Sequence, residues 1–488
     1  MIGSMLRKAQ LSGGCDATAS PDAPYDLTSS GVTSSSITLN WEDATSTPNE
    51  ASSYEVGISS DNTNWTSTTI NAPASLYTFS GLSSGTTHYF RIRGINCAGA
   101  SYYDGEGFTQ ATSAGTLSPS WTLDFSSGTP SGYTLTRASS GTYVDSSGYI
   151  ASAATNVARL THDSSGSRLG LLVEESRTQR ARNTSNWDAT LSNVSATRTA
   201  NYATAPNNQT EATRVELTST GYIYKSAEGA VPAGDYTLSV WIKATSSGQS
   251  IGIRTVAGGS GSITTVTTST TWTRYSYQRT LASSGGLEIG VDQRSSGIGG
   301  PGTSCDILIW GAQIENGADL TSYIPYTGTS GSTTRSADLA HVLDSNITSW
   351  GDPGALVVHF YPPGKAGTIL STDDASTAQV GIEASSTTAA RAFWSSGSTS
   401  TGTIGTGVQK AVHYWNGSTS KFCINGGTVQ SGTNNLTIGN TDFVTLGAEA
   451  TDSSNVPGTF SQYANCVIRK VEFYSGTLTD ANLQTITT

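Results

Sequence analysis

The sequence predicts an all-β protein built from three tandem β-sandwich units with a loop-rich connector. Short stretches in which apolar and polar residues alternate recur along the chain, and this is the period of a half-buried strand. Charged residues make up only 12% of the 488 residues, whereas 21 are Tyr, a composition that suits small, uncharged sheet surfaces. At roughly 150 residues per domain, this length corresponds to about three domains.

The charge balance excludes two classes of partner. The chain has 36 acidic and 25 basic residues, a formal net charge of −11. Nucleic acid and anionic membranes require a basic surface, so we expect neither as a partner. No segment approaches the run of about 18 apolar residues that spans a membrane. The first ten residues, MIGSMLRKAQ, lack the apolar core of a secretory signal, so we expect synthesis in the cytoplasm without export.

The cysteines exclude two kinds of cross-linked site. They are odd in number, far apart and without a CxxC pair: Cys15, Cys97, Cys305, Cys423 and Cys466. They therefore do not build a dense disulfide framework or a cysteine-rich zinc site. Cys423 and Cys466 could pair, but we favour buried free thiols in a chain folded in a reducing compartment.

Residues 21–115 form the first predicted sandwich. Ile37, Leu39 and Trp41 alternate with polar neighbours, and a second alternating stretch follows at residues 54–58. Several such strands separated by turn residues predict a β-sandwich of about 100 residues.

The same segment resembles the fibronectin type III family. The shared residues are Pro24, Leu27, Trp41 and Tyr54, followed by GLSSGTTHYFRIRGINCAGAS at residues 81–101. The segment departs from the family at Ser84, where Pro is usual, and at His88, where the family has its corner tyrosine. The resemblance therefore implies the fold but not the corner hydrogen bond.

Residues 116–182 predict a Ser/Gly-rich connector with a few short strands. Three acidic residues, Asp163, Glu174 and Glu175, lie among five arginines: Arg159, Arg168, Arg177, Arg180 and Arg182. We interpret them as a solvated or domain-bridging ion network. A binding site for anionic glycan is the alternative.

Residues 183–335 and 341–488 predict two further sandwiches. YTLSVWIKA at residues 236–244 alternates well, and SITTVTTSTTWTRYSYQRTL at residues 262–281 reads as a hairpin, so we expect a jelly roll. In the last segment, KAVHYWNGSTSKFCINGG has two strands joined by an Asn-Gly turn. This segment resembles laminin-G/concanavalin-A-like lectin domains, including a closing strand and a short helix around residues 479–486.

The order of motifs between residues 134 and 326 resembles bacteriophage tail and surface-fibre virion proteins. The motifs are TLTRASSGTYVDSSG, GLLVEESRT, Asn186-Trp187, SVWIKA, TTWTRYS and IWGAQIENGA with TSYIPY. In that family a connector leads into a carbohydrate-binding-module-like jelly roll. The chain departs from the family at Gln179-Arg180, where Asn and Leu usually follow. The resemblance implies a protein of the virion, on the tail or the capsid surface.

Motifs for catalysis are missing from the sequence. The five histidines form no pair at metal-ligand spacing, and neither GxSxG nor a P-loop occurs. A glycosidase needs two carboxylates flanking the sugar bond. Concanavalin-like glucanases supply theirs as ExDxxE, and Glu288 and Asp292 in LEIGVDQ lack the third member. We therefore expect no enzyme.

Calcium is the one cofactor that the sequence leaves open. Asp373-Asp374 and Asp442 could join a site of oxygen ligands, as in some sandwich lectins. No calcium-loop spacing supports such a site, so we expect no cofactor.

The positive signal for binding is aromatic. Flat rings stack on sugar faces, while polar groups hydrogen-bond to the hydroxyls. Trp241 and Trp272 match positions that the phage resemblance implies are structural. The candidates for a glycan platform are therefore Tyr222, Tyr224, Arg274, Tyr277, Trp394 and Trp415.

Together these observations predict a phage virion appendage, a tail fibre or surface decoration, that binds host-surface glycans. Residues 1–20, small and polar with Arg7 and Lys8, are expected to dock onto another virion protein. A homotrimer would protect edge strands and multiply weak sites. The alternatives are a glycan-depolymerising tailspike enzyme, a purely structural decoration protein and a bacterial surface adhesin.

Overall fold

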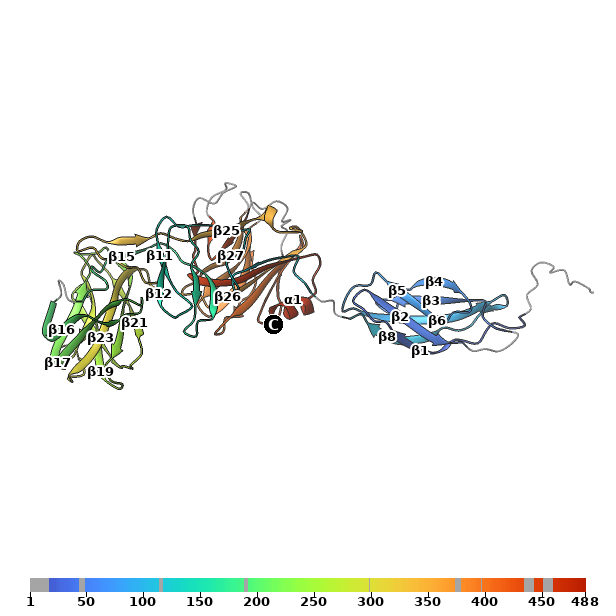
Figure 1. The fold of residues 1–488 in the computed structure, drawn as a ribbon. Coiled ribbons are helices and arrows are strands. Elements are labelled where there is room, and N and C mark those ends of the chain that lie inside the picture. Colours follow the sequence, from blue (N-terminus) through green and yellow to red (C-terminus); the bar gives the residue numbers. More distant parts are fainter. Residues whose placement is uncertain are drawn as a thin grey trace, which may run out of the picture. The chain divides into compact units, whose positions relative to one another are not determined.

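The computed structural model describes residues 17–43, 49–113, 117–187, 192–297, 299–373, 379–395, 397–433, 443–450 and 460–488. Strands dominate these residues, which confirms the predicted all-β class (Figure 1). The chain divides into two compact units, Met1–Ser118 and Pro119–Thr488. None of the helices in the described part is long and apolar enough to cross a membrane. Most of the predicted attachment arm, residues 1–16, lies outside the described residues.

The first unit is a sandwich of two antiparallel sheets. One sheet contains β1 (Tyr25–Ser30), β2 (Ser36–Glu42) and β5 (Leu76–Ser80). The other contains β3 (Ser53–Ser59), β4 (Thr66–Asn71), β6 (Thr87–Asn96), β7 (Gly99–Ala100) and β8 (Asp104–Ala111). Alternate side chains point inward, as the period-two pattern predicts. The buried core consists of Ile37, Leu39, Trp41, Tyr54, Val56, Phe79, Phe90 and Ile92.

His88 occupies the position at which the fibronectin type III family has its corner tyrosine. It is buried on β6, and its Nε2 atom has no hydrogen-bond partner among the described residues. Burial lowers the pKa of this imidazole. The fold therefore forms without a hydrogen bond from this ring nitrogen, in agreement with the departure noted in the sequence.

The second unit contains a middle β-domain at residues 177–335. Its strands are β15 (Arg177–Gln179), β16 (Ser192–Thr204), β17 (Thr210–Ser226), β18 (Gly234–Ala244), β19 (Ser250–Ala257), β20 (Ser260–Thr267), β21 (Thr273–Leu281), β22 (Leu287–Asp292), β23 (Cys305–Asn316) and β24 (Thr333–Arg335). The long strand β17 pairs with β23 through Thr213–Leu217 and with β22 through Tyr222–Ser226. The strands on its two sides share one buried apolar core, which includes Ile223, Leu238, Ile253 and Ile309.

The rest of the second unit is a terminal sandwich of two larger sheets. One sheet has the order β10 (Thr134–Thr136), β25 (Leu339–Leu343), β35 (Phe443–Leu446), β27 (Gly367–Asp373), β28 (Val380–Ser386), β29 (Ala389–Trp394) and β30 (Gly397–Ser398), with β31 (Gly402–Thr403) on β29. The other has the order β13 (Leu160–His162), β14 (Arg168–Val173), β38 (Cys466–Ser475), β26 (Gly354–Tyr361), β32 (Gln409–Trp415), β33 (Thr419–Ile424) and β34 (Gln430–Thr433), with β9 (Trp121–Asp124) on β38. Two short pairs complete the fold: β11 (Gly141–Val144) with β12 (Ile150–Ala153), and β36 (Glu449–Ala450) with β37 (Phe460–Ser461).

The few short strands predicted within residues 116–182 are present, but they belong largely to the terminal sandwich rather than to a separate connector. Four strands from this segment belong to the terminal sandwich: β10 pairs with β25, β9 and β14 pair with β38, and β13 pairs with β14. Leu123, Phe125, Leu171 and Val173 lie in the terminal core. Ser and Gly between short apolar stretches read as loop because nothing local indicates a pairing partner far along the chain.

The arginines of this segment form a buried ion network rather than a solvated one. Asp338 accepts hydrogen bonds from Arg137 Nη1 at 2.9 Å and from Arg159 Nη2, and Glu174 accepts from Arg159 Nη1 at 2.6 Å. Arg335, at the end of β24, lies 2.9 Å from Glu174. Although burial raises the pKa of Glu174, Arg335 and Arg159 hold it at about 2. The network joins the middle domain to the terminal sandwich, so the domain-bridging interpretation describes it.

Helix α1 (Asp480–Thr487) confirms the predicted terminal helix. Thr479 caps it by accepting a hydrogen bond from the backbone of Asn482.

The described cysteines are of two kinds. Cys305, Cys423 and Cys466 are buried free thiols, so the Cys423–Cys466 pair is not formed. Cys97 is disulfide-bonded, which departs from the expectation of a chain folded in a reducing compartment.

Candidate functional site

The six predicted platform residues do not form one site. They lie in three places: the outer face of the middle domain around β17, the strand β21, and the core of the terminal sandwich. The calcium candidates give no site either, since Asp374 and Asp442 lie outside the described residues and the Asp373 side chain is not described. Among the described residues, no cluster of three or more His, Cys, Asp or Glu could hold a metal ion.

Tyr222 and Tyr224 share one face of β17, as their spacing predicts. Their rings are stacked with centroids 6.0 Å apart and planes at 19°. Arg294 lies 4.1 Å from the ring centroid of Tyr222, and Arg254 lies 4.8 Å from that of Tyr224. Each ring thus contacts another ring and a guanidinium, and neither tyrosine lines the hollows around Trp241.

The carboxylates beside these tyrosines are held by the same arginines. Asp292 is fully buried and accepts from Arg294 Nη2 at 2.6 Å and from Arg254 Nη1 at 3.3 Å. Glu288 accepts from Arg254 Nη2 at 2.6 Å. Both carboxylates are therefore engaged by arginine donors, which leaves neither free to act on a sugar bond.

The other four predicted platform residues lie in different environments. Tyr277 packs against the apolar core of the middle domain, and burial raises the pKa of its hydroxyl. Trp394 and Trp415 are 6% and 0% exposed and belong to the core of the terminal sandwich, which removes both from the glycan platform. Their alternation with polar residues is equally typical of core-facing strand residues, which explains the error. Arg274 alone lies in a hollow.

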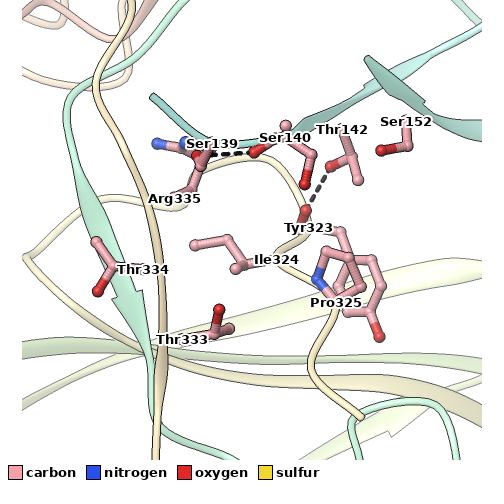
Figure 2. Close-up of a pocket in the computed structure, with 11 residues that line it drawn as sticks. Ser139, Ser140, Thr142, Ser152, Tyr323, Ile324, Pro325, Thr333, Thr334 and Arg335 are labelled. Atoms are coloured by element: carbon pink, nitrogen blue, oxygen red, sulfur yellow. Dashed lines mark hydrogen bonds between the residues drawn. The ribbon is translucent and has the colours of Figure 1, made fainter. Parts of the chain in front are cut away.

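A small hollow lies between the β11–β12 region and residues 323–335 of the middle domain. Figure 2 shows hydroxyl groups of Ser140, Thr142 and Ser152 near it, with Thr333 and Thr334 also lining it. Its volume is about 90 Å³. A space of this size suits a few water molecules rather than a ligand, since ligand sites span roughly 300–1,000 Å³.

A larger groove lies around Trp241 on β18. It consists of two hollows of about 360 Å³ each, and both are lined by Val144, Ile150 and Trp241. The first hollow also contains Arg274 and Tyr143, and the second contains Tyr149, Trp272 and Lys243. We call these seven side chains with Trp241 the Trp241 groove; its size matches that of ligand sites.

Strand register places the four most important side chains of the groove. Trp241 pairs with Arg274 across β18 and β21, and Ile242 pairs with Thr273. Lys243 follows Ile242 along β18, and Trp272 directly precedes Thr273 at the start of β21. The neighbours of Trp241 along β18, Val240 and Ile242, point into the buried core, so Trp241 and Lys243 lie on the opposite face. Two rings and two cations therefore alternate on this face.

Two features hold Trp241 in place at the groove. Gly311 on β23 has φ +67°, and a Cβ atom there would lie 2.8 Å from Trp241 Cε3, so a side chain at this position would displace the indole. Trp310 and Tyr323 pack edge-on against Trp241, with ring centroids 5.4 and 5.5 Å away. The indole is thus anchored on one side while it lines the hollows on another.

The β11–β12 hairpin forms the opposite wall. The amide of Ile150 donates to Pro206 O at 2.8 Å, and Thr142 Oγ1 donates to Tyr323 O, so the hairpin is fastened to the middle domain. Trp272 Nε1 donates to Thr204 O at 3.2 Å, which fixes this ring at the far end. A segment outside the middle domain therefore completes the groove.

The groove carries positive charge. Arg274 stacks 4.1 Å from the Trp241 ring centroid, and its Nη1 donates to Thr321 O at 2.7 Å. Burial lowers the pKa of Arg274 to about 10, so it stays charged at neutral pH. Of the residues that line the two hollows, Glu174 is the one acid, and it is already paired with Arg159 and Arg335.

Sequence reasoning found Arg274 but missed the importance of Trp241, Trp272 and Tyr149. The alternation in SVWIKA predicts that Trp241 and Lys243 lie on the face opposite the core, so their placement could have been inferred from the sequence. The hairpin that turns this face into a groove comes from residues 141–153. No local pattern indicates that the hairpin packs there.

Comparisons with known proteins bear on the first unit. Residues 22–110 match the family model of the fibronectin type III domain. The solution structure of the fn3 domain of the human collagen alpha-1(XX) chain is 18% identical, covering 22% of this chain and all of that one, with a TM-score of 0.19. A crystal structure of an FN3 domain of human collagen XX is 23% identical, covering 20% of this chain and all of that one, with a TM-score of 0.17. The search of curated proteins finds no match. Residues 22–110 of this chain are a fibronectin type III domain.

Proposed function

We propose that this chain is a glycan-binding protein of a bacteriophage virion, a tail fibre or surface decoration, and that the Trp241 groove is its sugar site. The observation that carries the binding proposal is the groove itself: Trp241, Trp272 and Tyr149 line hollows of ligand size beside cationic and hydroxyl-bearing side chains. Sugar faces pack on such rings while their hydroxyls bind the polar groups.

The carboxylates favour binding over cleavage. A glycosidase needs one carboxylic acid with a raised pKa and a second carboxylate across the sugar bond. Glu174 lines the groove, but its pKa of about 2 leaves it without a proton to donate at neutral pH. Burial raises the pKa of Glu315, but this side chain is fully buried and accepts hydrogen bonds from Thr321. We therefore propose a non-enzymatic protein.

The virion assignment rests on the order of sequence motifs between residues 134 and 326. The groove adds weight because its walls are built from those motifs: Thr142, Tyr143 and Val144 from SSGTYV, Trp241 from SVWIKA and Trp272 from TTWTRYS. We propose that several copies on one particle raise the avidity of individually weak sites, with a homotrimer as the first state to test.

The test is a panel of immobilised bacterial lipopolysaccharides and capsular polysaccharides, probed with the full chain. Trp272→Ala is the first variant, because this ring lines the groove and is half-exposed, so its loss should spare the fold. We expect binding to fall by about tenfold or more, since one stacked ring contributes on the order of 1–2 kcal/mol.

The matched control is Tyr222→Ala, which removes an aromatic ring of the same domain outside the groove. We expect this variant to bind like the unsubstituted chain. Binding that is lost in Tyr222→Ala but kept in Trp272→Ala would move the site to β17. Shortening of the polysaccharide during incubation would favour the tailspike enzyme, and a particle coated by a chain that binds no glycan would favour a structural decoration protein.

A further inference from the structure

The charge pattern of the Trp241 groove carries an inference about its ligand. The groove face holds Arg274 and Lys243 on adjacent strands next to Trp241 and Trp272. Neither cation forms an ion pair with any carboxylate in the described part of the chain. In this they differ from Arg254 and Arg294 beside Tyr222 and Tyr224, which pair with Glu288 and Asp292.

The hydrogen bonds of Arg274 leave part of its guanidinium available for an anion. Its Nε donates to Ser239 Oγ at 3.2 Å and its Nη1 to Thr321 O, both neutral acceptors. Its Nη2 is buried and has no hydrogen-bond partner in the described structure. A guanidinium has five donors in a planar fork that suits two oxygens of one anion. Glu315 and Glu174 act on this charge from beyond ion-pair distance, so an anion in direct contact with Arg274 would stabilise it further.

The carboxylates nearest to Arg274 cannot supply this charge. Glu174 accepts from Arg159 Nη1 at 2.6 Å and from Ser322 Oγ at 2.7 Å, and it lies 2.9 Å from Arg335. Glu315 accepts from the Thr321 amide at 3.0 Å, and burial favours its neutral form. Both carboxylates are thus engaged by other donors, and neither contacts the Arg274 guanidinium as an ion pair.

We infer that the Trp241 groove recognises an acidic glycan, with the anionic group of one sugar near Arg274 and Lys243 and the sugar faces on Trp241 and Trp272. This inference deepens the proposed glycan-binding function and rests on it. The long-range field of a chain with net charge −11 disfavours polyanions, so the attraction has to be local and of short range.

The test compares three probes by calorimetry with the full chain: an oligogalacturonate, the same oligosaccharide after chemical reduction of its carboxyl groups, and a sulfated neutral oligosaccharide. We expect the oligogalacturonate to bind about tenfold more tightly than its reduced form. Tighter binding of the sulfated probe would assign the anion as sulfate or phosphate rather than carboxylate and would still support an acidic ligand. Raising the salt concentration should weaken the acidic interactions and leave the neutral one unchanged.

Lys243→Gln and Arg274→Gln should abolish this preference, and Arg279→Gln should keep it, because Arg279 lies on β21 outside the groove and donates to Ser260 O. Lys243 is half-exposed, so its variant reports on binding even if Arg274→Gln fails to fold. Equal affinity for the acidic and reduced oligosaccharides, or an unchanged preference in Lys243→Gln, would overturn the inference. If neutral glycans from the panel bind and acidic ones do not, the acidic ligand is refuted while glycan binding stands; if nothing binds, both fall.

Discussion

The fibronectin type III domain and the terminal sandwich are built from strands in opposite ways. The strands of the first unit come from one continuous segment, and β1 to β8 all lie within residues 25–111. The terminal sandwich combines β9, β10, β13 and β14 with strands that begin at residue 339, and the middle domain is inserted between them. Glu175 and Asn465, which are hydrogen-bonded, are 290 residues apart. A contiguous domain can be recognised from local patterns, whereas an interrupted one depends on pairings that no local pattern specifies.

The largest expected effect comes from breaking the ion network that joins the interrupted parts. Asp338 is fully buried and accepts from Arg137, Arg159 and the amide of Glu174. Asp338→Asn leaves two buried guanidinium groups with less compensating charge, so we expect the second unit to lose about 3–5 kcal/mol of stability.

Differential scanning calorimetry of the full chain checks this prediction. Only the transition of the second unit should move to lower temperature, while that of the fibronectin type III domain should stay in place. A shift of both transitions would contradict the division of the chain into independent units.

The second effect depends on pH and is confined to the terminal sandwich. His413 is buried; one ring nitrogen lies 3.0 Å from Gly381 O and the other 3.1 Å from Ser420 Oγ. Burial lowers its pKa to about 4. Because the unfolded state binds a proton near pH 6.5 and the folded state does not, stability is complete above pH 6.5. It should decline by up to about 3 kcal/mol as the pH falls toward 4.

Denaturant unfolding at a series of pH values measures this decline. In His413→Gln the slope between pH 6.5 and 5 should be reduced, because the titrating group is gone while a polar side chain remains. An identical slope in both proteins would assign the acid sensitivity to other groups.

The smallest effect is expected in the fibronectin type III domain. His88 leaves a buried ring nitrogen without a partner at the position of the family's corner tyrosine. His88→Tyr replaces this unsatisfied group with a hydroxyl that can reach a backbone acceptor, so we expect a gain of about 1 kcal/mol. The calorimetric transition of the first unit alone should rise; a lower transition temperature would show that the corner geometry has changed to suit imidazole.

The structural elements that could be predicted from the sequence are those determined by residues close together in the chain. Alternation at Ile37, Leu39 and Trp41 identified a core strand, while the terminal helix around residues 479–486 was implied by the lectin resemblance. The candidate site was predicted only in part: Arg274 lies in the groove, whereas Trp394 and Trp415 lie in a core. An alternating strand has two faces, and which of them faces the core depends on elements elsewhere in the chain.

The pairing of β14 with β38 also has a consequence for synthesis. Strand β14 is complete at Val173, but its partner begins only at Cys466. At a translation rate of roughly 5–20 residues per second, β14 waits on the order of 15–60 s for β38, long enough for the inserted middle domain to fold first. During this time apolar residues such as Leu171 and Val173 have no permanent cover. The folding of the terminal sandwich is therefore expected to depend on how soon β38 leaves the ribosome.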